Sequence, residues 1–288
     1  EKNIIIIPIC NLGRRFFMSI KLICIDMDGT LLMDQHNIST EDKEAIKYAV
    51  NKGIHVAITT GRVYNCAKLY SDLIGLTTPI IASNGAFIGD SNGDEIYNNP
   101  LNIEDAKQFL EIAKKYNLFS YLTANFGIVS LEELPETNIY KVLNKTLRKE
   151  EQIKLEVLNN IDDIYKLYDG QILKGVCLEK NDTNKLLIAK KELQEKCPNL
   201  EIVSSWHDNF EIMKKGSSKG EAVEYLTKYL NLDKNEVMCI GDSENDLSMI
   251  KFAGIGVAMG NAIDKVKEAA SFITDSNTNS GVAKAIKK

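Results

Sequence analysis

Acidic side chains follow two apolar stretches that lie far apart in the sequence. Asp26 and Asp28 come after one stretch, and Asp242 and Asp246 come after the other. Asp26 and Asp28 are two residues apart, so both carboxylates point to one side if the chain is extended there. Carboxylates gathered at one place repel one another unless a cation neutralises them, and oxygen-only ligands suit Mg²⁺ better than Zn²⁺. The pattern therefore predicts a divalent metal site.

Other residues near these carboxylates could bind an anionic group. A phosphate ester carries negative charge of its own, so a site for one needs donors and a cation directed at the transferring group. Thr60, Lys219 and the backbone amides after Asp26 are the candidates. Each short motif also has an ordinary structural explanation, such as a solvated turn or a lysine at the start of a helix. Their occurrence together at the ends of several expected strands favours chemistry.

The segments that must position these residues alternate between short β-branched runs and longer amphipathic stretches. Strands are expected over residues 21–25, 54–59, 79–82, 236–240 and 256–259. A helix is expected after Ser39, which is a suitable N-cap with Asp42 at the N3 position. This alternation is typical of a parallel sheet covered on both faces. Ligands bind such sheets beyond the carboxyl ends of the strands, where the polar segments would converge.

A stretch with a different order of expected strands and helices lies between these strands. Strands are expected over residues 119–123, 127–131, 200–204 and 210–213, with helices over 102–116 and 182–196. Strands joined by short turns are antiparallel, because parallel strands need long crossovers. The sequence therefore predicts an α/β fold with a Rossmann-like parallel-sheet core, formed by residues 18–86 and 214–288. An α+β domain is predicted to be inserted at residues 87–213.

The composition excludes several classes of protein. A chain of 288 residues with 44% apolar and 26% charged residues is ordinary for a soluble globular protein, and we expect a cytoplasmic one. The net charge is −5 and Lys and Arg are spread along the chain, so nucleic acid is not an expected partner. The six cysteines lack Cys-x-x-Cys spacing and are expected to be reduced core residues.

The N-terminal residues 1–17 are expected to be an extension outside the fold. Their apolar run is too short to span a bilayer, and its charges follow the run instead of preceding it as in a secretory signal. We therefore expect no membrane association. We expect a monomer or a weak homodimer.

The ordered set of motifs resembles the haloacid dehalogenase (HAD) superfamily, in particular its Cof-like or IIB branch, which carries a large α+β cap. The resemblance covers nearly all of the chain from Met18 onward. The family's four motifs stand at residues 26–31 (Asp-Met-Asp-Gly-Thr-Leu), 60–62 (Thr-Gly-Arg), 219–220 (Lys-Gly) and 241–249 (Gly-Asp-Ser-Glu-Asn-Asp-Leu-Ser-Met). The Asn-Gly-Ala of this branch is present at residues 84–86. No motif residue is missing and their order is right.

The resemblance implies a Mg²⁺-dependent phosphatase that hydrolyses small phosphorylated metabolites, such as sugar phosphates. It makes Asp26 the nucleophile that forms an aspartyl-phosphate. Asp28 would protonate the leaving oxygen and then activate water. Asp26, Asp28 and Asp242 would form the metal site, with Asp28 helping through its backbone carbonyl or near neighbours. Asn245 and Asp246 would support them.

The resemblance also implies a set of residues around the substrate. Thr60 and Lys219 would bind the transferring phosphoryl oxygens, and Lys219 would neutralise Asp26. Gly61, Arg62 and Asn84 complete the predicted phosphate-binding and substrate-binding set, where Arg62 and Asn84 either touch the substrate or brace loops. An inserted cap implies an opening and closing motion that excludes water.

Two other functions remain open. A phosphomutase of the same superfamily would retain a phosphorylated product and transfer the group back, whereas a hydrolase releases phosphate. A non-catalytic binding or regulatory module would be marked by the loss of Asp26 or Asp28, and both are present. The substrate itself would be selected by cap residues whose positions cannot be derived from spacing.

Overall fold

The computed structural model describes residues 6–7, 18–34, 36–204 and 207–288. The extension predicted at residues 1–17 lies outside the described residues, apart from Ile6–Ile7 (β1), which pairs antiparallel with Met18–Ser19 (β2). None of the helices described is long and apolar enough to cross a bilayer. Five of the six cysteines are described, and all five are buried free thiols, as expected.

A five-stranded parallel sheet forms the centre of the core, in the order β16-β15-β14-β3-β4. Its strands are β3 (Leu22–Ile25), β4 (His55–Ile58), β14 (Val237–Gly241), β15 (Ile255–Ala258) and β16 (Phe272–Ile273). All four residues of β3 are buried, as expected for a parallel strand covered on both faces. The predicted α/β class with a parallel core is confirmed.

Helices follow the core strands. Helix α1 (Thr40–Asn51) begins after Ser39, whose hydroxyl accepts a hydrogen bond from the backbone N–H of Asp42, as the sequence predicts. The remaining helices of the core are α2 (Tyr64–Leu73), α7 (Lys219–Tyr229), α8 (Leu247–Phe252), α9 (Asp264–Ala269) and α10 (Gly281–Lys287). Helix α7 matters most for the site, because its first residue is Lys219.

A short antiparallel sheet adjoins the core sheet. It consists of β5 (Ile80–Ala82), β6 (Phe87–Gly89) and β7 (Glu95–Asn98), and the 3₁₀ turn η1 (Ser83–Gly85) follows β5. An isolated parallel bridge between Thr59 and Ile81 connects this sheet to the end of β4. Residues 87–98 thus pair with a core strand, although they fall inside the stretch predicted as inserted. The predicted domain limits themselves stay predictions.

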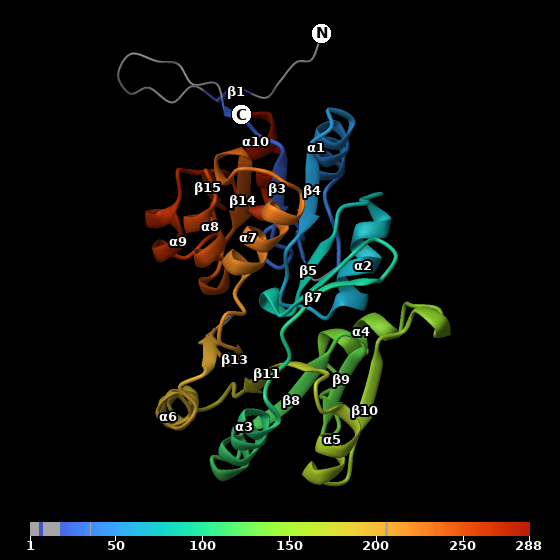
Figure 1. Cartoon of the computed structure of the whole chain (residues 1–288), viewed down its shortest axis with the longest axis vertical. Coiled ribbons are helices and arrows are strands. Elements are labelled where there is room, and N and C mark those ends of the chain that lie inside the picture. Colours follow the sequence, from blue (N-terminus) through green and yellow to red (C-terminus); the bar gives the residue numbers. More distant parts are fainter. Residues whose placement is uncertain (1–5, 8–17, 35, 205–206) are drawn as a thin grey trace.

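Residues 103–214, which we call the inserted unit, form a six-stranded sheet in the lower half of Figure 1. The order is β10-β9-β8-β11-β13-β12, and every neighbouring pair is antiparallel except β9 and β10. The strands are β8 (Phe119–Ala124), β9 (Gly127–Ser130), β10 (Lys154–Val157), β11 (Ile172–Leu178), β12 (Leu200–Val203) and β13 (Asn209–Lys214). The helices are α3 (Ile103–Lys115), α4 (Ile139–Asn144), α5 (Ile161–Tyr168) and α6 (Thr183–Lys196).

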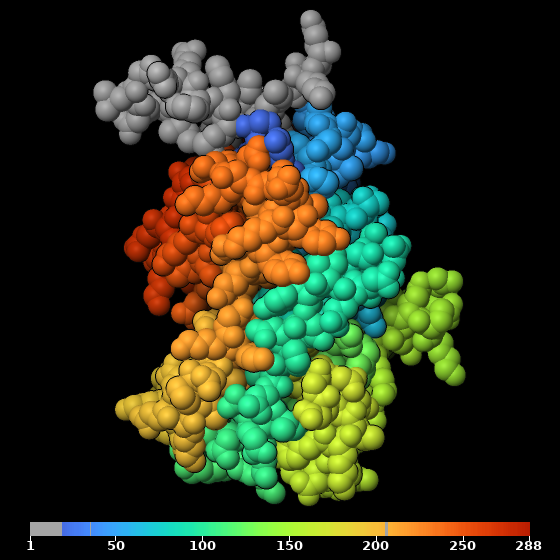
Figure 2. All heavy atoms as spheres, viewed as in Figure 1, coloured from blue at the N-terminus to red at the C-terminus, as the bar shows by residue number. Residues whose placement is uncertain are grey.

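The predicted strands and helices of this stretch are confirmed, but the sequence did not predict β10, α4, α5 or the central strand β11. The two chain crossings between the core and the inserted unit run side by side (Figures 1 and 2), and the Asn99 side chain donates a hydrogen bond to the Ser217 hydroxyl at 2.8 Å.

The two faces of the inserted sheet have different roles, because neighbouring residues of a strand point to opposite faces. Leu122, Cys177 and Phe210 lie in the hydrophobic cluster that this unit forms on its own. Tyr121, Val176 and Glu211 form one cross-strand row on the other face. Tyr121 and Val176 belong to the hydrophobic cluster that continues into the core. This second face, called the inner face below, therefore meets the core at the candidate site.

Candidate active site

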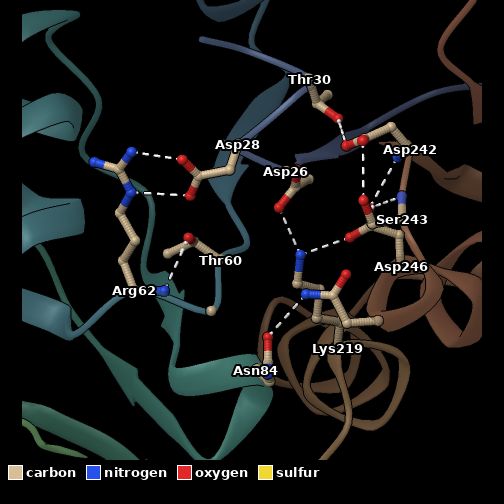
Figure 3. A network of polar contacts seen from close by, with 12 residues as sticks. Asp26, Asp28, Thr30, Thr60, Arg62, Asn84, Lys219, Asp242, Ser243 and Asp246 are labelled. Carbon is tan, nitrogen blue, oxygen red and sulfur yellow. Dashed lines mark hydrogen bonds and ion pairs between the residues drawn. The ribbon is translucent and has the colours of Figure 1, made fainter. Parts of the chain in front are cut away.

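The carboxyl ends of neighbouring parallel strands bring the predicted motifs to one place (Figure 3). Asp26 follows β3, Asp242 follows β14, and Thr60 and Asn84 lie just beyond β4 and β5. Lys219 enters from the start of α7. Asp26 and Asp242, which are more than two hundred positions apart, thus become neighbours because their strands are parallel and end at the same edge of the sheet.

Lys219 is the central cation of the site. Its side chain is fully buried, and Nζ lies 2.5 Å from Oδ1 of Asp26 and 2.5 Å from Oδ1 of Asp246. Burial alone lowers the pKa of a lysine, but the charges of Asp246 and Asp26 outweigh burial and raise the pKa of Lys219. Lys219 therefore remains charged between the two carboxylates.

Asp246 shapes the loop after β14. Its second oxygen accepts hydrogen bonds from the backbone N–H groups of Asp242, at 2.8 Å, and Ser243, at 2.9 Å. Both of its oxygens are thus engaged, one with Lys219 and the other with the loop. The supporting role expected for Asp246 in the reaction stays a prediction.

The carboxylates outnumber the lysine. One oxygen from each of Asp26, Asp242 and Asp246 lies within 4.8 Å of the others. Burial, and next the charge of Asp246, raises the pKa of Asp26 well above its usual range. The same two causes raise the pKa of Asp242 to about 6. These raised pKa values mean that ionising the carboxylates together is unfavourable unless a further cation joins them, so the cluster favours binding of a cation.

The surroundings of Asp242 fit a hard divalent cation such as Mg²⁺, which prefers oxygen ligands. The hydroxyl of Thr30 donates a hydrogen bond to Oδ1 of Asp242 at 2.9 Å, and the hydroxyl of Ser243 donates one to Oδ2 at 2.9 Å. Gly29, at φ +82°, leaves room for this carboxylate, because a Cβ there would lie 2.5 Å from Oδ2 of Asp242. Asp242 is thus oriented toward Asp26 by fixed donors.

Asp28 is not part of this acidic cluster. Its carboxylate accepts two hydrogen bonds from the buried guanidinium of Arg62, from Nε at 2.9 Å and from Nη2 at 2.5 Å. Figure 3 shows Asp28 turned toward Arg62, and Asp26 turned toward Lys219. The predicted role of Asp28 at the metal therefore rests on its backbone carbonyl or near neighbours, and Arg62 braces Asp28 in this structure.

The turn of residues 60–62, called the phosphate turn below, is tied to Asn84 by its backbone. The N–H of Asn84 donates to the carbonyl of Thr60 at 3.0 Å, and the N–H of Ser83 donates to the carbonyl of Arg62 at 2.9 Å. The hydroxyl of Thr60 accepts a hydrogen bond from the N–H of Arg62 at 3.1 Å. A Cβ at Gly61 would lie 2.8 Å from Oδ1 of Asn84, so the glycine permits this close approach.

The inner face supplies site residues that the sequence did not predict. A cavity of about 270 Å³ lies between Asp26, Asp28 and Arg62 of the core and the inserted unit. Helix α4 contributes Ile139 and Tyr140 to its lining, and the inner face contributes Tyr121, Lys174, Val176, Leu178, Asn209 and Glu211. The one available signal was a lysine inside the otherwise apolar run of β11. A lone acidic residue in β13 gave no such signal.

The comparisons with known proteins decide the family. The sequence matches the family described as haloacid dehalogenase-like hydrolase over residues 23–286. The chain belongs to this family. The 5-amino-6-(5-phospho-D-ribitylamino)uracil phosphatase YcsE of Bacillus subtilis is 35% identical over 274 residues, which cover 95% of this chain and 97% of that protein.

A second B. subtilis enzyme with the same described activity, YwtE, is 35% identical over 277 residues, covering 91% of this chain and 96% of its own. The solved structure of a haloacid dehalogenase-like hydrolase from B. subtilis has a TM-score of 0.82 and 29% identity, with 93% of this chain and 99% of that chain covered. The resemblance derived from the motifs is confirmed, and the chain is a phosphatase of the haloacid dehalogenase-like family.

Proposed function

We propose that this phosphatase is a Mg²⁺-dependent phosphomonoester hydrolase that cleaves small phosphorylated metabolites through an aspartyl-phosphate on Asp26. The contact that carries the proposal is the 2.5 Å pair of Asp26 with the buried Lys219, at the end of β3 and at the edge of the cavity. A cavity of about 270 Å³ suits a small leaving group and excludes a folded protein or a duplex.

The protein's own groups divide the reaction between them. An oxygen of Asp26 forms the new bond to phosphorus while the bond to the ester oxygen breaks, and Asp28 supplies the proton that the leaving oxygen takes. Asp28 then accepts a proton from the water that attacks phosphorus, which releases phosphate and restores Asp26. Arg62 fixes the orientation of Asp28 by two hydrogen bonds.

Charge stabilisation comes from groups that are already in place. Lys219 donates a hydrogen bond to Asp26, and Thr60 is buried just beyond β4; both would donate to the phosphoryl oxygens, and preorganised donors of this kind contribute strongly to catalysis. Mg²⁺ held by Asp26 and Asp242 would offset the excess of negative charge and polarise a phosphoryl oxygen. Asp246 supports the loop that carries Asp242, and Asn245 supports Asn84 beside the turn that carries Thr60.

The substrate class is inferred from the cavity and from the relatives together. The inner face offers polar groups at Lys174, Asn209 and Glu211 and apolar or aromatic groups at Tyr121 and Val176. Such a wall suits a leaving group that has both hydroxyls and an apolar portion. Sugar phosphates, and the ribitylaminouracil phosphate that YcsE and YwtE are named for, are therefore the first substrates to test.

The decisive experiment measures phosphate release from a panel of such esters, with Mg²⁺ and with EDTA. We expect release by the wild type in Mg²⁺, none in EDTA, and a loss of roughly 10⁴-fold or more in Asp26→Asn, as for other nucleophile knockouts. Acid quenching after mixing with ³²P-labelled ester should leave label on the wild type and none on Asp26→Asn. The exposed Asp169→Asn is the matched control and should behave as wild type.

Three results would contradict the proposal. If the wild-type protein releases no phosphate from any ester, it is not a hydrolase of these substrates. If the ³²P label moves to a second position of a sugar phosphate, the protein is a mutase. Undiminished turnover in Asp26→Asn would exclude Asp26 as the nucleophile.

A further inference from the structure

The inner face carries a buried ion pair that no motif includes. Lys174 lies in β11 and Glu211 in β13, and Nζ of Lys174 is 3.2 Å from Oε2 of Glu211. The exposed fractions of the two residues are 3% and 6%. Burying two charges costs free energy that a pair of apolar residues would not cost, so stability alone does not account for this pair.

Both members of the pair also contact the core. Nζ of Lys174 donates a hydrogen bond to the backbone carbonyl of Gly61 at 2.7 Å. The carboxylate of Glu211 accepts a hydrogen bond from Nδ2 of Asn84. The side chain of Asn84 in turn accepts one from Asn245 at 3.1 Å, which extends the chain of contacts to the loop after β14.

These contacts all involve one pair of adjoining backbone segments, the phosphate turn and residues 83–84. Gly61 belongs to the phosphate turn, and Asn84 is bonded to the same turn through its backbone N–H. Ser83 and Asn84 have φ values of +50° and +55°, a left-handed conformation that non-glycine residues keep only where their surroundings hold them. Glu211 is one of the groups that hold Asn84 there. The inserted unit therefore contacts a segment of the core whose backbone has a strained conformation.

We propose that Lys174 and Glu211 are positioning residues, through which the inserted unit holds the phosphate turn and Asn84 in the geometry required for phosphoryl transfer. This proposal rests on the function proposed above for Thr60 in that turn. Its consequence is that the phosphate site is complete only while the inner face is docked on the core. Docking then contributes to the chemical step itself as well as to the exclusion of water.

The first test compares two esters with different leaving groups, p-nitrophenyl phosphate and the best substrate of the panel. Glu211→Gln and Lys174→Met should each lower kcat by about 10-fold to 100-fold, the range expected when reacting groups are displaced by up to an ångström. The factor should be the same for both esters, with little change in KM, because the phosphoryl group is common to them. Lys174→Arg, which keeps the charge and a donor, should recover part of the loss.

A matched control removes the same charges elsewhere in the inserted unit. Lys115 and Glu192 form an ion pair of 2.7 Å between α3 and α6, away from the core. Lys115→Met and Glu192→Gln should leave kcat unchanged for both esters. If Glu211→Gln does not fold, the double variant Lys174→Met/Glu211→Leu replaces both charges by apolar groups and should fold with the same loss of kcat.

A second measurement does not depend on turnover. Backbone amide hydrogen exchange in peptides that cover residues 60–62 and 83–86 should be faster in Glu211→Gln than in wild type by about tenfold, because local opening becomes easier. It should be unchanged in Glu192→Gln. If the wild type hydrolyses no ester, the proposed function fails, and hydrogen exchange still tests whether the pair holds the turn.

Three results would overturn the positioning role. A loss confined to one ester would show that Lys174 and Glu211 contact the leaving group and select it. Unchanged kcat for both esters would show that the pair has no part in the reaction. Unchanged exchange at residues 60–62 and 83–86 would show that the turn keeps its geometry without the pair.

Discussion

The core sheet and the inserted sheet both place buried charges at the candidate site, but they do so in different ways. In the core, Asp26 and Asp242 lie on loops beyond strand ends, and three clustered carboxylates surround the buried ammonium of Lys219. In the inserted sheet, Lys174 and Glu211 lie within strands and form a one-to-one pair. An excess of negative charge favours a metal ion, which could then bind an anionic phosphate, whereas a balanced pair requires only fixed geometry. The comparison supports the proposals that the core carries the chemistry and that the inserted unit positions it.

The largest effect on stability is expected from removing the lysine of each charge cluster, Lys219 in the core or Lys174 in the inserted sheet. Lys219→Met leaves the buried carboxylates of Asp26 and Asp246 without their cation, which should lower the free energy of unfolding by about 3–5 kcal/mol. Lys174→Met leaves one carboxylate, which Asn84 still contacts, so its cost should be smaller. Urea unfolding in EDTA, where no metal compensates for the lost lysine, measures both.

The control for this pair of variants is Lys228→Met, which breaks an exposed ion pair with Glu224 of 2.7 Å. Exposed pairs of this kind contribute about 0.5 kcal/mol or less, so its effect should be close to zero. A cost of Lys174→Met equal to that of Lys219→Met would remove the proposed difference between the two clusters.

The same contrast explains what the sequence could predict. Asp26, Thr60 and Asp242 follow strands whose apolar runs are plain in the sequence, and parallel strands necessarily bring their carboxyl ends to one edge. The fold class and the strands that carry these residues could therefore be predicted. Local sequence was sufficient for this prediction because the position of each residue depends only on its own strand and the turn that follows.

The contacts across the two units could not be predicted in this way. Apart from Lys174, the run of β11 is apolar on both faces, so it lacks the alternation that marks a half-buried strand and could equally belong to a buried helix. Glu211 lies in a predicted strand, but its burial depends on the docking of that strand against Asn84 of the core. The pairing of Arg62 with Asp28 was likewise left open, because both residues lie on separate loops whose side-chain directions spacing does not define.

A second prediction tests whether the core site depends on the room left beside Asp242. Gly29 and Gly53 have nearly equal φ values, +82° and +79°, so an alanine at either position carries a similar cost of about 1–2 kcal/mol in a left-handed conformation. Only at Gly29 would the new Cβ meet Asp242, at 2.5 Å from Oδ2, since nothing lies within 4 Å at Gly53. Gly29→Ala should lower kcat by about 100-fold through displacement of Asp242, and Gly53→Ala should not.

Steady-state phosphate release at saturating Mg²⁺ measures this difference, with melting temperatures to show that the two variants are comparably destabilised. Equal kcat for Gly29→Ala and Gly53→Ala would mean that the position of Asp242 is not critical, and the assignment of chemistry to the core edge would lose its basis.

The smallest effect is expected from the hydroxyl that orients Asp242. Thr30 donates a buried hydrogen bond of 2.9 Å to Oδ1 of Asp242. Groups that orient a metal ligand typically contribute 10-fold to 100-fold to metal affinity, so Thr30→Val should raise the Mg²⁺ concentration for half-maximal activity by about tenfold. Thr59→Val is the matched control, because the Thr59 hydroxyl is also buried and has no hydrogen-bond partner among the residues that the structure describes.

Titration of activity with Mg²⁺ separates the roles of the two regions. Thr59→Val should keep the wild-type Mg²⁺ requirement and equal or slightly greater stability, since it removes an unsatisfied hydroxyl. Glu211→Gln should lower turnover at every Mg²⁺ concentration without shifting the requirement, because Glu211 contacts the phosphate turn through Asn84 and not Asp242. A shifted Mg²⁺ requirement in Glu211→Gln, or an unshifted one in Thr30→Val, would mean that metal binding is not a property of the core alone.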